Sequence, residues 1–166
     1  MELPKRKPTR LRDYDYSQNG AYFVTICTKD RKNILSVINV GVGVLDDPQN
    51  QLSQYGMIAD KYINQMNNFY DYINVDKYVI MPNHIHLLLS ISNFEIGTSG
   101  TPSPTNSHLA RFVSTFKRFC NKEIGKNIWQ RSFHDHIIRG KEDYLKIWEY
   151  TDNNIQKWEN DCFYTK

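Results

Sequence analysis

Two histidines separated by one residue, His84 and His86, have the type and spacing that predict metal chemistry. They fall in the segment HIHLLL, which is rich in strand-forming residues and predicts a β-strand. Side chains alternate between the faces of a strand, so both imidazoles leave one face while Ile85 and Leu87 point into the core. Two neutral imidazoles that converge on one point suit a divalent cation and leave room for further ligands. Taken alone, this spacing also fits a structural or incidental pair.

A second pair with the same spacing, His134 and His136, competes with the first. It flanks Asp135 in a segment whose strand character is weaker, whereas the first pair lies in an apolar strand directly after a Met-Pro-Asn turn. The pattern therefore favours His84 and His86, but only modestly.

The last part of the chain predicts a helix over residues 141–158 that carries two further candidate groups. At about 100° per residue, one stripe of this helix docks it on the protein; the stripe consists of Tyr144, Ile147, Trp148, Thr151, Ile155 and Trp158. Tyr150 and Asn154 lie off that stripe, one turn apart. An amide oxygen at this position could be a third metal ligand while the phenol reaches the same site. A solvent-edge tyrosine beside a polar residue is the plainer alternative.

The remaining segments predict the elements that would position these residues. Strands are expected over 21–28, 71–80, 84–89 and 128–138, helices over 57–66 and 109–124, and a loop over 41–54. The order β-α-β-β-α-β predicts an α+β fold, the ferredoxin-like split βαβ sandwich, with an antiparallel sheet and helices on one face. The C-terminal helix with Tyr150 then follows.

The division of the chain into segments follows from composition. Residues 1–12 predict a basic N-terminal arm, and residues 13–166 predict a single catalytic domain. The stretch from about residue 95 to residue 107 is rich in Gly, Ser, Thr and Pro, which is typical of a flexible linker.

The net charge of +3 is small, but the basic residues are concentrated in two places. One is the N-terminal arm, with Lys5, Arg6, Lys7, Arg10 and Arg12; the other is the helix over 109–124, with Arg111, Lys117, Arg118 and Lys122. Such concentrations are what a surface that binds a polyanion requires, so both are candidate sites for contacts with a nucleic acid. A solvated tail and an ordinary helix face would give the same pattern.

Other features of the sequence exclude several classes of protein. No apolar run approaches the roughly 20 residues that cross a bilayer, and no apolar stretch follows the basic N-terminus as in a signal peptide. We therefore expect a cytoplasmic protein that does not bind membranes. The three cysteines, Cys27, Cys120 and Cys162, have no CxxC spacing, which argues against a disulfide framework and a zinc knuckle.

Four segments of the chain, in order and with similar spacing, resemble the REP-associated tyrosine transposases. They are YDYSQNGAYFVTICTKDR (14–31), YVIMPNHIHLLL (78–89), WQRSFHDHIIR (129–139) and DYLKIWEYTDNNIQKW (143–158). The resemblance covers nearly all of the chain after residue 10. Members of that family often have Asn-Pro where this chain has Asn154-Ile155. The missing proline would let the helix continue, and it leaves Asn153 as an alternative to Asn154.

The resemblance implies a particular site and reaction. His84 and His86 become the metal-binding pair of a ferredoxin-like HUH domain, Asn154 the polar ligand, and Tyr150 the nucleophile. The cofactor would be Mg²⁺ or Mn²⁺, and the substrate single-stranded or hairpin DNA from palindromic repeats, cleaved and rejoined through a 5′-phosphotyrosine. The resemblance assigns no task to His134 and His136. Both a homodimer and a monomer are compatible with it.

Two other readings of the sequence stay open. One is a domesticated protein that binds DNA hairpins without cutting them. The other is a metal-dependent hydrolase that activates water in place of Tyr150. An RNA-recognition module shares the expected fold, but the chain lacks an RNP1-like string, and two histidines on the sheet face are a poor stacking platform.

Overall fold

A computed structural model describes residues 14, 18–39, 48–92 and 107–165 of the chain. Its main elements are β1 (Gly20–Cys27), β2 (Ser36–Asn39), β3 (Gln49–Leu52), α1 (Gln54–Met66), β4 (Ile73–Ile80), β5 (His84–Ile91), α2 (His108–Ile124), β6 (His134–Ile138) and α3 (Lys141–Asp152). The described residues also form two short 3₁₀ helices, Lys29–Arg31 and Trp158–Asn160. The expected arm over 1–12 and nearly all of the expected linker over 95–107 lie outside the described residues.

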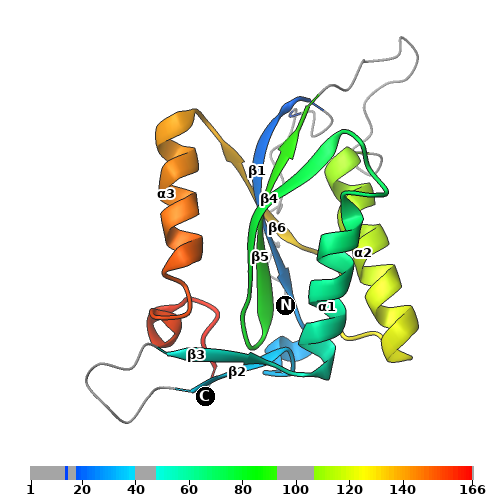
Figure 1. Cartoon of the computed structure of the whole chain (residues 1–166), viewed down its shortest axis with the longest axis vertical. Coiled ribbons are helices and arrows are strands. Elements are labelled where there is room, and N and C mark those ends of the chain that lie inside the picture. The colour runs from blue at the N-terminus through cyan, green and yellow to red at the C-terminus, as the bar shows by residue number, and fades with distance from the viewer. Residues whose placement is uncertain (1–13, 15–17, 40–47, 93–106, 166) are drawn as a thin grey trace, which may run out of the picture.

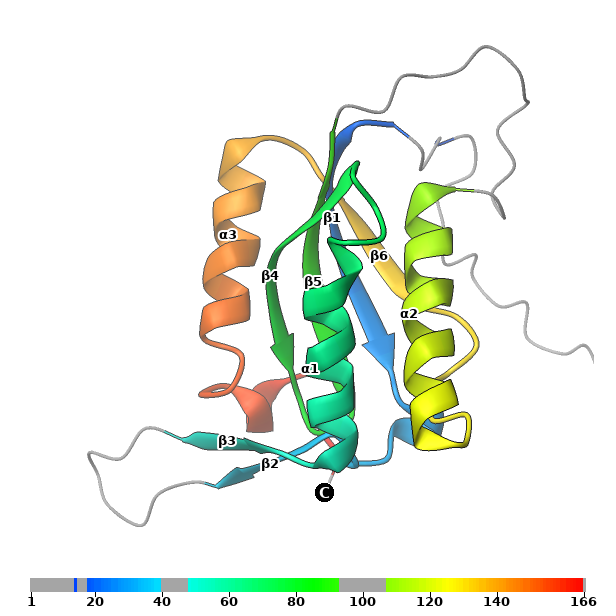
Figure 2. The same cartoon turned by 45° about the vertical axis from the view of Figure 1, so that its right-hand side comes forward.

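Four strands form an antiparallel sheet in the order β4-β5-β1-β6. This is the order of a split βαβ sandwich, in which β5 lies between β4 and β1, and β1 lies between β5 and β6. Helices α1 and α2 cover one face of the sheet, and α3 lies on the other (Figures 1 and 2). The predicted α+β ferredoxin-like class, with an added C-terminal helix that carries Tyr150, is therefore confirmed.

The hydrophobic core lies between the sheet and the layer of α1 and α2. Side chains alternate between the two faces of each strand, which explains why the apolar residues of β5 point into this core. Ile85, Leu87 and Leu89 of β5 are fully buried on this face. The predicted apolar side of α2 packs against them, with Leu109, Phe112, Val113, Phe116 and Cys120 all buried. Each such side chain contributes about 1.5–3 kcal/mol through removal from water. The core therefore holds β5 rigidly, and with it the opposite face that carries the histidines.

The expected loop over 41–54 is partly wrong, because residues 49–52 form β3, which pairs with β2. The sequence QNQL has no apolar alternation, so no pattern marks it as a strand. The two strands pair through their backbones, and Asn50 ties the hairpin to the end of β4, because its Nδ2 donates to the Ile80 carbonyl at 2.8 Å. Gly56, just after this hairpin, permits a close approach: a Cβ there would lie 2.1 Å from the Leu35 carbonyl oxygen.

Two further element boundaries differ from the prediction. The expected strand over 128–138 is shortened to β6, because the carbonyl oxygens of Gln130 and Ser132 accept hydrogen bonds from the Lys117 ammonium at 2.8 and 2.9 Å. The expected helix over 141–158 ends at Asp152, the last residue of α3. Beyond it the chain turns back, which lets Trp158 pack against Val79 and Met81. No helix among the described residues is long and apolar enough to cross a membrane.

Candidate active site

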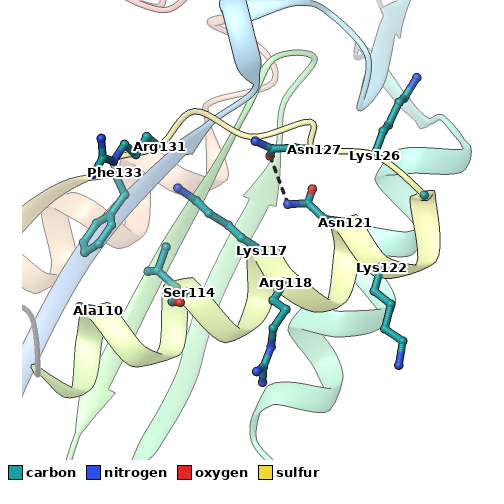
Figure 3. A pocket seen from close by; sticks show the side chains of 12 residues that line it. Ala110, Ser114, Lys117, Arg118, Asn121, Lys122, Lys126, Asn127, Arg131 and Phe133 are labelled. Atoms are coloured by element: carbon teal, nitrogen blue, oxygen red, sulfur yellow. Dashed lines mark hydrogen bonds between the residues drawn. The ribbon is translucent and has the colours of Figure 1, made fainter.

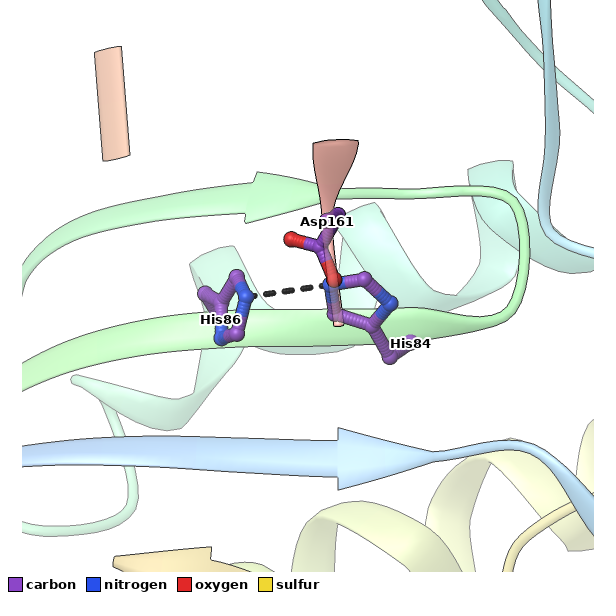
Figure 4. A group of neighbouring side chains, drawn as sticks. All are labelled: His84, His86 and Asp161. Carbon is purple, nitrogen blue, oxygen red and sulfur yellow. Dashed lines mark hydrogen bonds between the residues drawn. The ribbon is translucent and has the colours of Figure 1, made fainter. Parts of the chain in front are cut away.

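His84 and His86 converge as the alternation along β5 predicts. Their Nε2 atoms lie 3.0 Å apart, and both side chains are buried, on the face of the sheet that α3 covers. Figure 4 shows the two rings projecting from the same strand toward each other. The Phe23 ring stacks on the His86 ring with centroids 4.8 Å apart, which fixes the plane of that imidazole.

Neighbouring polar groups fix the orientation of each imidazole. Asn83 donates through Nδ2 to the Phe163 carbonyl at 2.8 Å, so its Oδ1 is the atom that faces His84 Nδ1, also at 2.8 Å. An amide oxygen only accepts, so Nδ1 of His84 carries the proton and Nε2 presents a lone pair. His86 Nδ1 lies 2.8 Å from the Thr25 hydroxyl. Partners of this kind on the outer ring nitrogen are typical of histidines that bind a metal.

Burial keeps both imidazoles uncharged. It lowers the pKa of His84 to about 3, with a further contribution from the positive charge of Arg31. Burial also lowers the pKa of His86 well below its ordinary value, and repulsion from His84 adds to this effect. Two neutral rings with converging nitrogens are the form that binds a divalent cation.

Tyr150 lies at the edge of this pair. Its hydroxyl is 3.4 Å from His86 Nε2 and donates to Asp161 Oδ2 at 3.0 Å. The side chain is 40% exposed, so the phenol is accessible from solvent while it touches the histidines. Burial and the negative charge of Asp161 raise the pKa of Tyr150 to about 12, so the phenol is protonated at neutral pH.

Asn154 lies at the site, but in a turn and not on the helix where the sequence predicted it. Helix α3 ends at Asp152, so Asn154 does not lie one turn beyond Tyr150 on a continuous helix. Asn154 is instead buried in the turn after α3, where its Nδ2 donates to Asp161 Oδ2 at 3.3 Å. Its Oδ1 is a buried oxygen without a hydrogen-bond partner among the described residues. Asn153, the alternative, donates from its side chain to the Glu149 carbonyl within its own helix. The structure therefore places Asn154, not Asn153, beside Tyr150.

Asp161 is the site residue that the sequence analysis missed. It lies beyond α3, and one ligand atom each from His84, His86 and Asp161 fall within 4.8 Å of one another (Figure 4). No spacing in the sequence marks this carboxylate. The only available signal is the aromatic pair Trp158 and Phe163 around it, which indicates that the segment packs back on the protein.

The second histidine pair does not form a comparable centre. His134 and His136 lie on the edge strand β6 and are exposed. His136 Nε2 lies 2.9 Å from Asp143 Oδ2, which also accepts the backbone N–H of Arg139 at 2.9 Å. This contact ties the first turn of α3 to β6, so His136 helps to position the helix that carries Tyr150.

The predicted basic helix face borders a groove of about 760 Å³. Arg118 and Lys122 of α2 line it, together with Lys126 and Arg131 from the connection to β6 (Figure 3). Lys117 also lines it, but its ammonium holds the carbonyls of that connection. Arg111 is exposed and is not part of the lining. Because α2 and α3 lie on opposite faces of the sheet, this groove is on the far side from the histidine pair.

The sheet order and the converging imidazoles beside a tyrosine define a ferredoxin-like domain with a two-histidine site. Over 96% of its length the chain is 31% identical to an "Uncharacterized protein" of Haemophilus influenzae, of which it covers 93%. A "Putative REP-associated tyrosine transposase" of the same organism is 26% identical, with 82% of this chain and 70% of that protein aligned. The chain belongs to the same family as the first of these proteins, and it is a relative of the REP-associated tyrosine transposases.

The comparison of structures agrees on the fold. A solved REP-associated tyrosine transposase bound to a REP hairpin superimposes with a TM-score of 0.61 over 90% of this chain and 73% of that one, at 20% identity. No family model matches the chain.

Proposed function

We propose that this protein cleaves and rejoins single-stranded DNA in a metal-dependent reaction, with Tyr150 as the nucleophile. The observation that carries the proposal is the hydroxyl of Tyr150, 3.4 Å from Nε2 of one of two converging, uncharged histidines. A phenol in contact with a potential metal site has the position that a nucleophile for covalent catalysis needs. The sequence relationship to the REP-associated tyrosine transposases supports the same reaction.

The residues present fit a divalent cation, Mg²⁺ or Mn²⁺, held by His84, His86 and Asn154. The two Nε2 atoms would supply nitrogen ligands, and Asn154 Oδ1, which has no hydrogen-bond partner among the described residues, would supply an oxygen. A buried acceptor without a partner is destabilising, and a cation would satisfy it. When bound, the cation supplies positive charge that polarises the scissile phosphate and favours the ionised phenol.

Tyr150 then performs the covalent step. The Tyr150 hydroxyl, which is exposed to solvent, gives up its proton to water, and the phenolate oxygen attacks the phosphorus in line. The bond from phosphorus to the 3′-oxygen breaks, and that oxygen takes up a proton from water and leaves as a 3′-hydroxyl. The 5′-phosphate stays on Tyr150 as a phosphotyrosine, so the energy of the broken ester is retained. A 3′-hydroxyl of another strand reverses the step without a nucleotide cofactor. His86 and Phe23 hold the phenol ring in place, at centroid distances of 5.5 and 5.9 Å.

Hairpin DNA fits the charge distribution of the protein. The related solved protein is bound to a REP hairpin. In this chain the stem would lie along the basic groove of α2, and the single strand would pass around the edge strand β6 to reach Tyr150. Residues 5–12, with Lys5, Arg6, Lys7, Arg10 and Arg12, would add further phosphate contacts.

This placement predicts the effect of removing charge from the groove. The double substitution Arg118→Gln and Lys122→Gln should lower hairpin affinity about tenfold and reduce the slope of log K against log salt by about 1–2. Binding curves at several salt concentrations measure both quantities. Lys146→Gln, on the exposed side of α3, is the matched control and should change neither. An unchanged salt slope in the double variant would place the stem elsewhere.

The experiment that tests the proposed function incubates the protein with Mn²⁺ and end-labelled single-stranded hairpin DNA from the flanks of its own gene. A covalent, protease-sensitive band on a denaturing gel supports the proposal. Cleavage without such a band would favour a hydrolase that activates water. Tight hairpin binding without cleavage would favour a DNA-hairpin-binding protein without catalysis.

A further inference from the structure

The C-terminal segment after α3 is built to hold one carboxylate in the active site. Trp158 packs against Val79 and Met81 at the end of the sheet. The Phe163 ring lies 4.7 Å from the His84 ring, and Asn83 binds the Phe163 carbonyl. Between these two anchors lies Asp161, whose Oδ1 accepts the Phe163 backbone N–H at 2.6 Å. The other carboxylate oxygen, Oδ2, is thereby directed to Tyr150 and Asn154.

The ligands assigned so far leave a charge problem in the site. Two neutral imidazoles and an amide oxygen carry no negative charge, yet a dication among buried side chains needs compensation. Among the described residues, Asp161 is the only Asp or Glu whose carboxylate falls within 4.8 Å of ligand atoms of both histidines. Asn154, whose Nδ2 donates to the same carboxylate, has a buried Oδ1 without a hydrogen-bond partner among the described residues, and a cation beside Asp161 would satisfy it.

We infer that Asp161 is a metal ligand of this site, so that the cation is held by two imidazoles, one amide oxygen and one carboxylate. The inference rests on the metal site of the proposed function and adds a residue to it. A carboxylate beside an amide oxygen favours the hard cations Mg²⁺ and Mn²⁺ over softer metals.

The same carboxylate oxygen already has a competing partner. Asp161 Oδ2 accepts the hydrogen bond from the Tyr150 hydroxyl at 3.0 Å. Ligation by Asp161 withdraws that acceptor, so the phenol is released from the carboxylate when the site is loaded. Metal binding and release of the nucleophile are therefore coupled through one side chain.

Binding of Mn²⁺ alone, followed by electron paramagnetic resonance of the free ion, tests the assignment without DNA or activity. Asp161→Asn keeps the size of the side chain and should lower Mn²⁺ affinity at least about tenfold. Glu159→Gln is the control, because Glu159 lies in the same segment and is exposed. It should leave the affinity within about twofold, since it holds no contact with the site. Circular dichroism in EDTA checks the fold, and Asp161→Ser replaces Asp161→Asn if that variant is unfolded.

A double-mutant cycle tests the competition. Tyr150→Phe should raise Mn²⁺ affinity about threefold to tenfold, because Asp161 no longer gives up a hydrogen bond to the phenol. The same substitution in the Asp161→Asn background should leave the affinity unchanged. Equal effects in both backgrounds would overturn the coupling.

The outcomes separate this inference from the proposed function. If Asp161→Asn binds Mn²⁺ as tightly as the original protein, and His84→Ala does not bind it, Asp161 is no ligand but the histidine site stands. If the original protein does not bind Mn²⁺ at all, both the inference and the metal-dependent reaction fail.

Discussion

Tyr150→Phe is expected to abolish the covalent protein–DNA adduct and to reduce strand cleavage by a factor of about 10³ or more. The substitution removes the attacking oxygen and nothing else from the site. A phenylalanine keeps the edge contacts to Phe23 and His86, so the pocket retains its shape. Hairpin binding should persist within about threefold, since a single hydroxyl at the site contributes little to a contact dominated by phosphates. A denaturing gel of labelled DNA measures the adduct, and filter binding measures affinity.

Tyr144→Phe is the matched control for this experiment. Tyr144 lies on the same helix, but its hydroxyl donates to Asp76 at 3.0 Å on β4 and does not face the histidines. Its loss should leave the adduct yield unchanged. Cleavage that survives in Tyr150→Phe would refute the tyrosine mechanism and point to activated water. An adduct that is lost in both variants would indicate that α3 has shifted, and the nucleophile would have to be mapped by mass spectrometry.

His84→Ala is expected to lower Mn²⁺ affinity by roughly 100-fold or more, and to abolish cleavage with it. The substitution removes one of two converging nitrogen donors and leaves His86 alone with oxygen ligands. Isothermal titration calorimetry with Mn²⁺ gives the affinity directly. Because Asn83 Oδ1 loses its partner, the variant should also be less stable, by about 1–3 kcal/mol.

His136→Ala separates the two histidine pairs of the sequence. His136 contacts Asp143 and lies on the edge strand, so its loss should leave Mn²⁺ affinity within about twofold. Cleavage should fall modestly, because Asp143 then holds the start of α3 less firmly. Should His136→Ala weaken Mn²⁺ binding as much as His84→Ala does, the metal centre would have to include β6.

Local patterns in the sequence determined the sheet and its helical cover. Alternation over 84–89 gave β5 one apolar face, and the apolar residues of 109–124 recur at helical spacing. Burial of these faces against each other is enforced by the hydrophobic effect, which depends on residue type and period alone. Hence the fold class and the projection of His84 and His86 from one face were both predictable.

The end of α3 and the carboxylate of Asp161 were not predictable in this way. The apolar residues of the last helix recur at helical spacing as far as Trp158, so their pattern does not predict that the helix ends at Asp152. What ends the helix is the packing of Trp158 against Val79 of β4 and Met81 of the turn that follows β4, both far away in sequence. The turn after α3 brings Asp161 to Tyr150, and Asn154 reaches the site from the turn itself.

The two histidine pairs show the same division between sequence and structure. Spacing alone places each pair on one face of a strand, and it is identical in both. The sequence around the pairs favours the first only modestly, and the sheet order separates them clearly. β5 is an inner strand whose histidines are buried among Asn83, Thr25 and Tyr150, whereas β6 is an edge strand whose histidines are exposed. Burial keeps the first pair neutral and convergent, and that environment is a property of the tertiary structure.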